Sequence, residues 1–134
     1  MNNKVDFQSL SPNLIVADVN RSVEFYEGML GFVKLASVPE TGRFDWAMVG
    51  RGPVVVMFQT AASMRHDLPS LDLSGAGTTA TFYIKVKGLD ELLKTIRGKV
   101  DLVVPLRKTF YGANEFAIKD PDGYVLMFAE DAQH

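Results

Sequence analysis

The 134-residue sequence contains no cysteine and only two histidines, His66 and His134. The absence of cysteine excludes disulfides, thiolate metal sites, iron–sulfur clusters and cysteine nucleophiles, and it is typical of a reducing compartment. His66 lies between Arg65 and Asp67, and His134 is the last residue of the sequence. No pattern places a partner beside either histidine, so we expect a solvated loop and a frayed end rather than a Ser-His-Asp triad.

An excess of one charge and a long apolar run are also lacking. Lys and Arg number 14 and Asp and Glu number 16, a net charge of -2 that offers no electrostatic basis for binding nucleic acid. The longest strongly apolar run, Val54–Phe58, is far too short to cross a membrane, and the polar segment Met1–Leu10 has no apolar core of a secretion signal. We therefore expect a cytoplasmic protein that binds neither nucleic acid nor membranes.

Hydrophobic residues make up 47% of the sequence, enough for a single domain with a buried core over residues 1–134. Asn13–Val16 has the short apolar pattern of a strand. An apolar stripe at helical spacing follows, formed by Val19, Val23, Tyr26 and Met29. Asp18 or Asn20 is the expected N-terminal cap of this helix. Gly28 and Gly31 indicate where it ends.

Three extended segments complete the first half of the chain, at Phe32–Val38, Arg43–Val49 and Val54–Gln59. The same order returns after an offset of 70 residues, the separation of Val16 and Val86. The second copy consists of a strand at Thr79–Val86, a helix at Leu89–Ile96, and extended segments at Leu102–Pro105, Phe116–Ile118 and Tyr124–Phe128.

The offset keeps helix stripe, strands and turns in register, because it sets Val23 on Leu93 and Trp46 on Phe116. We therefore predict an α+β fold of tandem βαβββ modules, at about residues 10–60 and 78–130, with a connector rich in Ser, Gly and Thr at residues 61–77. Asp120–Gly123 has the composition of a tight turn rather than of a catalytic group, with Gly123 supplying an unusual φ.

Three motifs occupy characteristic places in this arrangement: Leu14–Tyr26, Leu30–Phe32 and Asn114–Tyr124. With them the sequence resembles the vicinal oxygen chelate superfamily, which includes glyoxalase I, extradiol dioxygenases, fosfomycin-resistance enzymes and bleomycin-resistance proteins. The resemblance implies mixed sheets that curl around a shared cavity, helices on the outer faces, and a homodimer. Whether the modules pair within one chain or swap between two chains stays open.

The resemblance also implies four metal-ligand positions, two in each module: Ser11, Met57, Thr81 and Met127. Metal-dependent members hold His, Gln or Glu there, whereas Ser, Thr and Met cannot build a Ni, Zn, Mn or Fe site of that kind. A register shift of two residues offers Asn13, Gln59, Tyr83 and Ala129, again without histidine or carboxylate. We therefore expect no metal and no cofactor, as in the metal-free drug-binding members.

The residues expected to bind a ligand in the implied cavity are Asn13, Trp46, Met57, Gln59, Thr81, Tyr83, Tyr111, Glu115 and Met127. Polar side chains on an enclosed face need hydrogen-bond partners, water or a ligand. Met57 and Met127 could line an adaptable pocket or simply fill the core. Trp46 could face either side of its strand, and Phe110–Tyr111 could stack on a flat ligand. Glu115 could accept a cationic group, act as a base or be solvated.

The leading hypothesis is metal-independent binding of an apolar or aromatic small molecule, with antibiotic sequestration or resistance as one outcome. Bleomycin itself is not favoured, because a bulky cation would bind better to a more acidic protein than one at -2. The alternative is a glyoxalase-like lyase, isomerase or dioxygenase with an atypical metal site, or with metal-free acid–base chemistry by Glu115 or Tyr83. A structural, partner-binding subunit is the third hypothesis, and whether any catalysis occurs stays open.

Overall fold

The computed structural model describes residues 5–70 and 80–132. Thr79, His134 and the part of the connector after residue 70 lie outside the described residues. Among the described residues, no helix is long and apolar enough to span a membrane.

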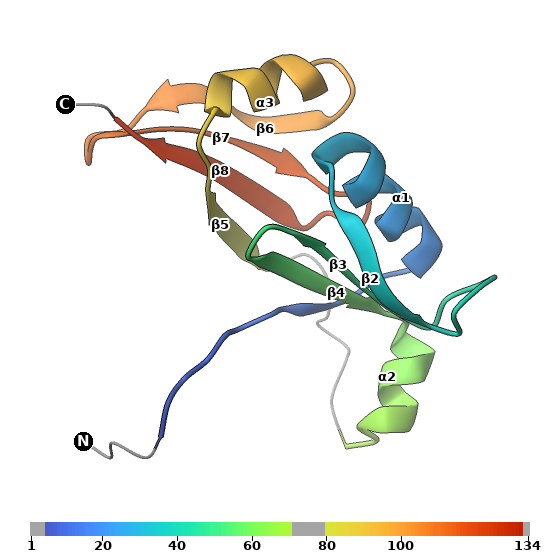
Figure 1. Cartoon of the computed structure of the whole chain (residues 1–134). Helices are drawn as coiled ribbons and strands as arrows, with labels where there is room; N and C mark the ends of the chain where they lie inside the picture. The colour runs from blue at the N-terminus through green and yellow to red at the C-terminus, as the bar shows by residue number, and fades with distance from the viewer. Residues whose placement is uncertain (1–4, 71–79, 133–134) are drawn as a thin grey trace.

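Two copies of one arrangement make up the chain (Figure 1). The first copy contains β1 (Asn13–Ile15), α1 (Val19–Leu30), β2 (Val33–Val38), β3 (Trp46–Arg51) and β4 (Val54–Gln59). The second contains β5 (Thr81–Lys85), α3 (Leu89–Ile96), β6 (Asp101–Lys108), β7 (Ala113–Lys119) and β8 (Val125–Asp131). The predicted α+β fold with a repeated βαβββ arrangement is confirmed.

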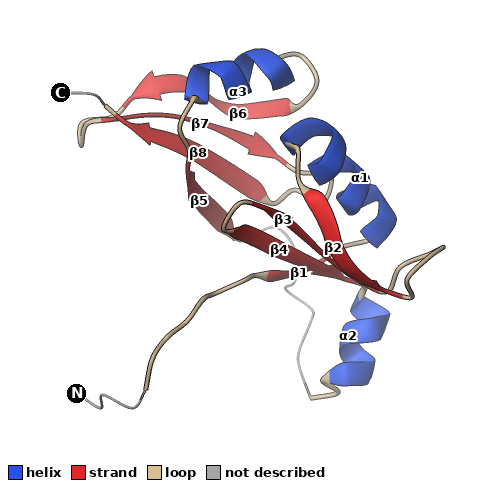
Figure 2. Ribbon diagram, in the orientation of Figure 1, coloured by secondary structure: helices blue, strands red, loops and turns tan. Residues whose placement is uncertain are grey.

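Each copy forms its own four-stranded mixed sheet (Figure 2). The strand orders are β1-β4-β3-β2 and β5-β8-β7-β6, and the first strand of each module pairs in parallel with the last. The helices α1 and α3 lie close together on one side of the two sheets (Figure 1). The two sheets are not closed around one cavity in the chain, so the shared cavity that the resemblance implies is not complete in this chain.

The α1 helix begins and ends where side-chain and backbone chemistry allow it. Asp18 is the N-terminal cap, and its carboxylate accepts from the backbone N–H of Arg21 at 3.2 Å. Gly31 is the C-terminal cap in the left-handed region, with φ of 69°, which glycine adopts without a steric cost. Asn20 and Gly28, the other candidates for these two ends, lie inside the helix.

The core lies between the helices and the sheets, because alternate side chains of β3, β4, β7 and β8 point toward the helices. In the first sheet Val49 and Phe58 are buried beneath α1, and in the second Phe116 and Leu126 are buried beneath α3. The opposite surface of each sheet carries no such layer from α1 or α3. We call it the helix-free face because neither α1 nor α3 covers it, although the short helix α2 described below contacts it at Gln59.

One helix lies where the sequence pattern indicated only a connector: α2 (Ala61–Asp67) follows directly on β4. The Thr60 hydroxyl accepts from the backbone N–H of Ser63 at 3.1 Å and caps the helix. Met64 is buried and anchors it to the rest of the chain. Composition did not predict α2 because the Ser, Gly and Thr content of the whole connector obscured this short helical stretch.

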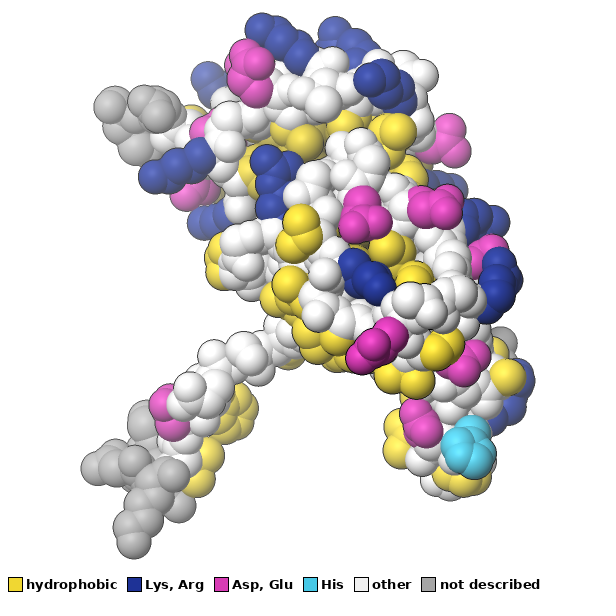
Figure 3. Space-filling view, turned by 45° about the vertical axis from the view of Figure 1, so that its right-hand side comes forward, with side chains coloured by type: hydrophobic (Ala, Val, Ile, Leu, Met, Phe, Trp, Pro, Cys, Tyr) yellow, Lys and Arg dark blue, Asp and Glu magenta, His cyan; other side chains and the backbone are white. Residues whose placement is uncertain are grey.

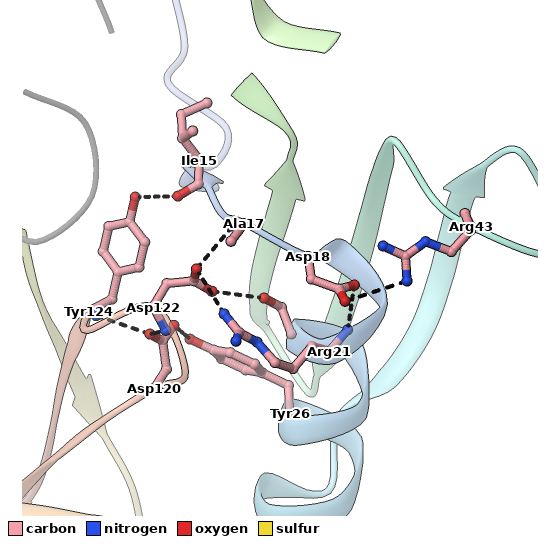
Figure 4. Close-up of polar contacts among 10 residues, drawn as sticks. Ile15, Ala17, Asp18, Arg21, Tyr26, Arg43, Asp120, Asp122 and Tyr124 are labelled. Carbon is pink, nitrogen blue, oxygen red and sulfur yellow. Dashed lines mark hydrogen bonds and ion pairs between the residues drawn. The ribbon is translucent and has the colours of Figure 1, made fainter. Parts of the chain in front are cut away.

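The turn Asp120–Gly123 joins the two modules as well as β7 to β8 (Figure 4). Gly123 has φ of 89°, which confirms the predicted unusual backbone. The Asp122 carboxylate accepts from the backbone N–H of Ala17 at 2.9 Å, from the Arg21 guanidinium at 3.2 Å and from the Ser22 hydroxyl at 3.3 Å. A turn of module two therefore holds the start of α1 in module one.

Two tyrosines complete this junction between the modules (Figure 4). The buried Tyr26 hydroxyl donates to the Asp120 carboxylate at 2.9 Å, and the Tyr124 hydroxyl donates to the Ile15 carbonyl at 2.9 Å. Burial raises the pKa of Tyr26 and of Asp120, because both charged forms lose contact with water. The junction thus fixes how the two sheets sit relative to each other.

Candidate functional site

Four of the predicted ligand-binding residues lie together on the helix-free face of the first sheet. Asn13 is directly opposite Met57 in the β1–β4 pair, and Trp46 is directly opposite Gln59 in the β3–β4 pair. Residues directly opposite in paired strands point to the same side of a sheet. Trp46 and Met57 are half-buried, so these side chains form one patch, and the open question of which way Trp46 points is answered by the register.

Two amides in this patch are held by hydrogen bonds. The Asn13 Nδ2 donates to Gln59 Oε1 at 2.8 Å. Gln59 is 4% exposed, and its Nε2 donates to Ser63 Oγ at 2.9 Å and to Asp67 Oδ2 at 2.8 Å. The helix α2 therefore orients the amide of Gln59, which in turn orients that of Asn13.

The other five predicted residues gather on the helix-free face of the second sheet. Tyr83 is directly opposite Met127 in the β5–β8 pair, and Thr81 lies two residues before Tyr83 on the same side of β5. Glu115 on β7 is directly opposite Ala129 of β8 on that face, and Tyr111 reaches it from the turn before β7. Thr81 and Tyr83 are exposed, whereas Met127 is half-buried.

Glu115 is almost fully buried and has both carboxylate oxygens occupied. Its Oε1 accepts from Arg107 Nε at 3.2 Å and from Arg107 Nη2 at 2.9 Å, and its Oε2 accepts from the Tyr111 hydroxyl at 2.7 Å. The Tyr111 hydrogen bond, with a further contribution from Arg107, holds the pKa of Glu115 below its usual value although burial acts in the opposite sense.

This arrangement gives Glu115 little capacity as a base, because a carboxylate with a lowered pKa and two engaged oxygens holds a proton weakly. The same hydrogen bond raises the pKa of Tyr111 to about 12, so its hydroxyl stays protonated at neutral pH. The contacts favour a positioning role for Glu115, since its carboxylate orients the side chains of Arg107 and Tyr111.

Sequence analysis missed three residues that hold this site: Ser63, Asp67 and Arg107. A signal for two of them existed, because Ser63 and Asp67 are four residues apart, the spacing of one helix face. Arg107 had no such signal. It is directly opposite Glu115 in the β6–β7 pair, which contains two register shifts that only the paired strands reveal.

The four positions implied as metal ligands do not fit a metal ion. Met57, Thr81 and Met127 lie on the helix-free faces, and Ser11 precedes β1. Thioether and hydroxyl groups are poor ligands for Ni, Zn, Mn or Fe. Within residues 5–70 and 80–132, no group of three or more His, Asp or Glu side chains could hold a metal ion.

Two remaining candidates lie at the surface. His66 is exposed on α2. Phe110 is 99% exposed in the turn between β6 and β7, and its ring meets that of Tyr111 edge to face, with the ring centres 5.1 Å apart. This aromatic pair therefore projects beside the Glu115 cluster and is available for stacking.

Two of the hollows in the described part of the chain lie between the first module and β5 or α3. One of about 300 Å³ is lined by Val54, Phe82 and Tyr83 among others, so it borders the second helix-free face. The other, of about 610 Å³, lies between the end of α1 and α3, with Leu92 and Phe128 in its lining and Glu27 and Arg51 among its charged residues. Figure 3 shows apolar side chains in a hollow among acidic and basic ones.

The comparisons with known proteins agree with this fold. Residues 8–128 match the family model described as the Glyoxalase/Bleomycin resistance protein/Dioxygenase superfamily. The chain belongs to this superfamily. No curated protein matches the sequence.

Several solved structures share this fold at low sequence identity. TioX from Micromonospora sp. ML1 is 21% identical with a TM-score of 0.78, over 93% of this chain and 99% of that one. A protein of unknown function from Agrobacterium tumefaciens is 22% identical with a TM-score of 0.76, over 95% and 96%. The bleomycin-binding protein from Streptomyces verticillus, solved with copper(II)-bleomycin, is 24% identical with a TM-score of 0.65, over 97% and 99%.

Proposed function

We propose that this superfamily member binds an apolar or aromatic small molecule without a metal, and that it acts in the cytoplasm by sequestering that molecule, as in resistance to an antibiotic. The observation that carries the proposal is the patch of Trp46 and Met57 beside the paired amides of Asn13 and Gln59. The patch includes Met57, one of the four positions at which the resemblance implies a metal ligand in metal-dependent members.

The side chains of the patch suit a flat, largely apolar compound. An indole ring offers a broad stacking surface, and the flexible, polarisable thioether of methionine adapts to many shapes. A few polar groups in fixed positions then orient the ligand, which is common in binding sites for small molecules. Tyr83, Tyr111 and Met127 supply the same combination on the second sheet.

We further propose that two copies form a homodimer in which the helix-free face of the first sheet in one chain faces that of the second sheet in its partner. The two faces belong to separate sheets that are not closed around one cavity in the chain. Large apolar side chains are exposed nearby, with Phe7 95% and Leu10 88% exposed in the N-terminal segment that leaves the body (Figure 1). A second copy would cover such surface.

Trp46 is the only tryptophan in the sequence, so intrinsic fluorescence reports on this patch directly. We expect fused aromatic antibiotics, in contrast to copper(II)-bleomycin, to change the Trp46 emission in a saturable way, equally in EDTA and with added Zn²⁺. The substitution Met57→Ala should weaken binding about tenfold, the equivalent of roughly 1.4 kcal/mol of lost apolar contact.

Met29→Ala provides the matched control, because Met29 is also half-buried but lies on α1, away from the helix-free face. Its affinity should equal that of the unchanged protein. Calorimetry of Trp46→Ala gives an independent reading that does not depend on fluorescence. If neither Met57→Ala nor Trp46→Ala alters the affinity for a bound compound, the site has been assigned to the wrong face.

A further inference from the structure

One hydrogen-bond acceptor in the module-one patch has no partner. Asn13 Oδ1 is buried, and no hydrogen bond to it exists within the described residues. A buried acceptor without a donor costs free energy, and most buried polar atoms in folded proteins have a partner. Asn13 Oδ1 therefore needs an explanation, and its position beside Met57 on the helix-free face offers one.

The orientation of the two amides follows from their partners. Asp67 Oδ2 is an acceptor, so Gln59 must direct its Nε2 toward Asp67 and Ser63. Gln59 Oε1 then faces Asn13, and only the Nδ2 of Asn13 can donate to it. Rotating the Asn13 amide by 180° would bring two carbonyl oxygens together. The amide orientation that leaves Asn13 Oδ1 without a donor is therefore set by α2 through Gln59, and exchanging the O and N atoms of the amide would not remove it.

We propose that the ligand supplies the missing donor: a planar aromatic compound with a ring N–H or an amide N–H directed at Asn13 Oδ1. This inference rests on the proposed function and specifies its ligand class. Aromatic lactams, cyclic ureas and N–H heteroaromatics belong to that class, whereas purely hydrocarbon aromatics do not. Asn13 as a whole is only half-buried, so a small rotation of the side chains around Oδ1 on binding would admit the donor. The flat ring would then lie over Met57 and Trp46 while its edge satisfies the amide.

A matched pair of probes isolates the donor. Quinolin-2(1H)-one carries a lactam N–H, and coumarin has the same shape with a ring oxygen in that place. Ligand-observed NMR and calorimetry on the full chain should show the lactam binding about tenfold more tightly than coumarin, since a hydrogen bond to a buried acceptor contributes that much. The comparison uses the unchanged protein and so does not depend on how any variant folds.

Variants then assign the preference to one residue. Asn13→Leu should abolish the tenfold preference for the lactam, and Asn13→Ser offers a smaller replacement if the leucine variant does not fold. Thr95→Val, an exposed position on α3 away from both helix-free faces, is the matched control and should keep the preference. Equal affinity for both probes in the unchanged protein, with both weakened by Met57→Ala, would refute this inference while leaving the proposed function intact. Binding of neither probe would refute both.

Discussion

Glu115 shows how neighbouring groups set the chemistry of a single residue. In the sequence it is one carboxylate in a strand, open to three readings: cation acceptor, base or solvated side chain. In the fold it accepts from Arg107 and Tyr111 and is shielded from water. Its pKa is lowered, with the Tyr111 hydrogen bond as the main cause. The charged form is therefore the one that the folded state stabilises.

Glu115→Gln should reduce the free energy of unfolding by about 1–3 kcal/mol at pH 7, because buried donors lose a charged acceptor. A lowered pKa contributes stability above its usual value of 4.5 and loses it as the pH falls through the folded-state pKa. The difference between the two proteins should therefore shrink below pH 4.5. Urea unfolding across the acid range measures it.

Glu91→Gln is the control for this substitution, since Glu91 forms an exposed pair with Lys94 on α3. Exposed pairs contribute about 0–1 kcal/mol, so little change is expected at any pH. A stability loss in Glu115→Gln that stays constant down to strongly acidic pH would contradict the assignment of a charged Glu115.

Elements are positioned relative to one another by the turn Asp120–Gly123 and the start of α1. Sequence composition identified this segment as a turn. It did not indicate that Asp122 accepts from Ala17, Arg21 and Ser22, about a hundred residues earlier in the chain. A carboxylate at the start of a helix is also stabilised by the unpaired N–H groups there. The hydrogen bonds of Asp122 and its favourable electrostatic interaction with the start of α1 both hold the two modules together.

Asp122→Ala should lower the free energy of unfolding by about 1–3 kcal/mol, because it leaves the Ser22 hydroxyl, which is buried, and the Ala17 N–H without their partner. Thermal and urea unfolding provide the measurement. Asp131→Ala is the matched control, since it removes an exposed pair with Lys85 and should cost about 0–1 kcal/mol. Equal losses in the two variants would show that the junction contributes nothing beyond a surface ion pair.

At the scale of the whole molecule, the separate sheets and the exposed N-terminal side chains make assembly the decisive question. Sedimentation equilibrium should give twice the 14.8 kDa mass of one chain. Replacing Phe7 and Leu10 by serine should shift the equilibrium toward monomer, because their exposed apolar surface would no longer be removed from water on association.

The control is Leu68→Ser, which changes an exposed leucine at the end of α2, remote from the N-terminal segment in sequence. Its monomer–dimer equilibrium should match that of the unchanged protein. A mass of one chain at every concentration tested would exclude the homodimer and would leave each helix-free face to bind its ligand alone.

The sequence by itself determined every element except α2, and the repetition of the modules, because both depend on local patterning. Apolar residues at helical spacing predicted α1 and α3, and the offset of 70 residues predicted the second module. Parity along the strands also predicted which residues share a face. Alternation along β4 was enough to predict that Met57 and Gln59 share a face, whereas Asn13 on β1 was added to that face through the family resemblance.

Only the tertiary structure decided which groups meet across the chain. The pairing of Arg107 with Glu115 depends on register shifts between β6 and β7. The side of the sheet on which Trp46 lies depends on the pairing of β3 with β4. The hydrogen bonds of Asp122 depend on how the two modules dock. The unused Asn13 Oδ1 depends on α2 as well. Hydrogen bonds between distant segments leave no periodic trace in a sequence, because their geometry is set by packing after the elements have formed.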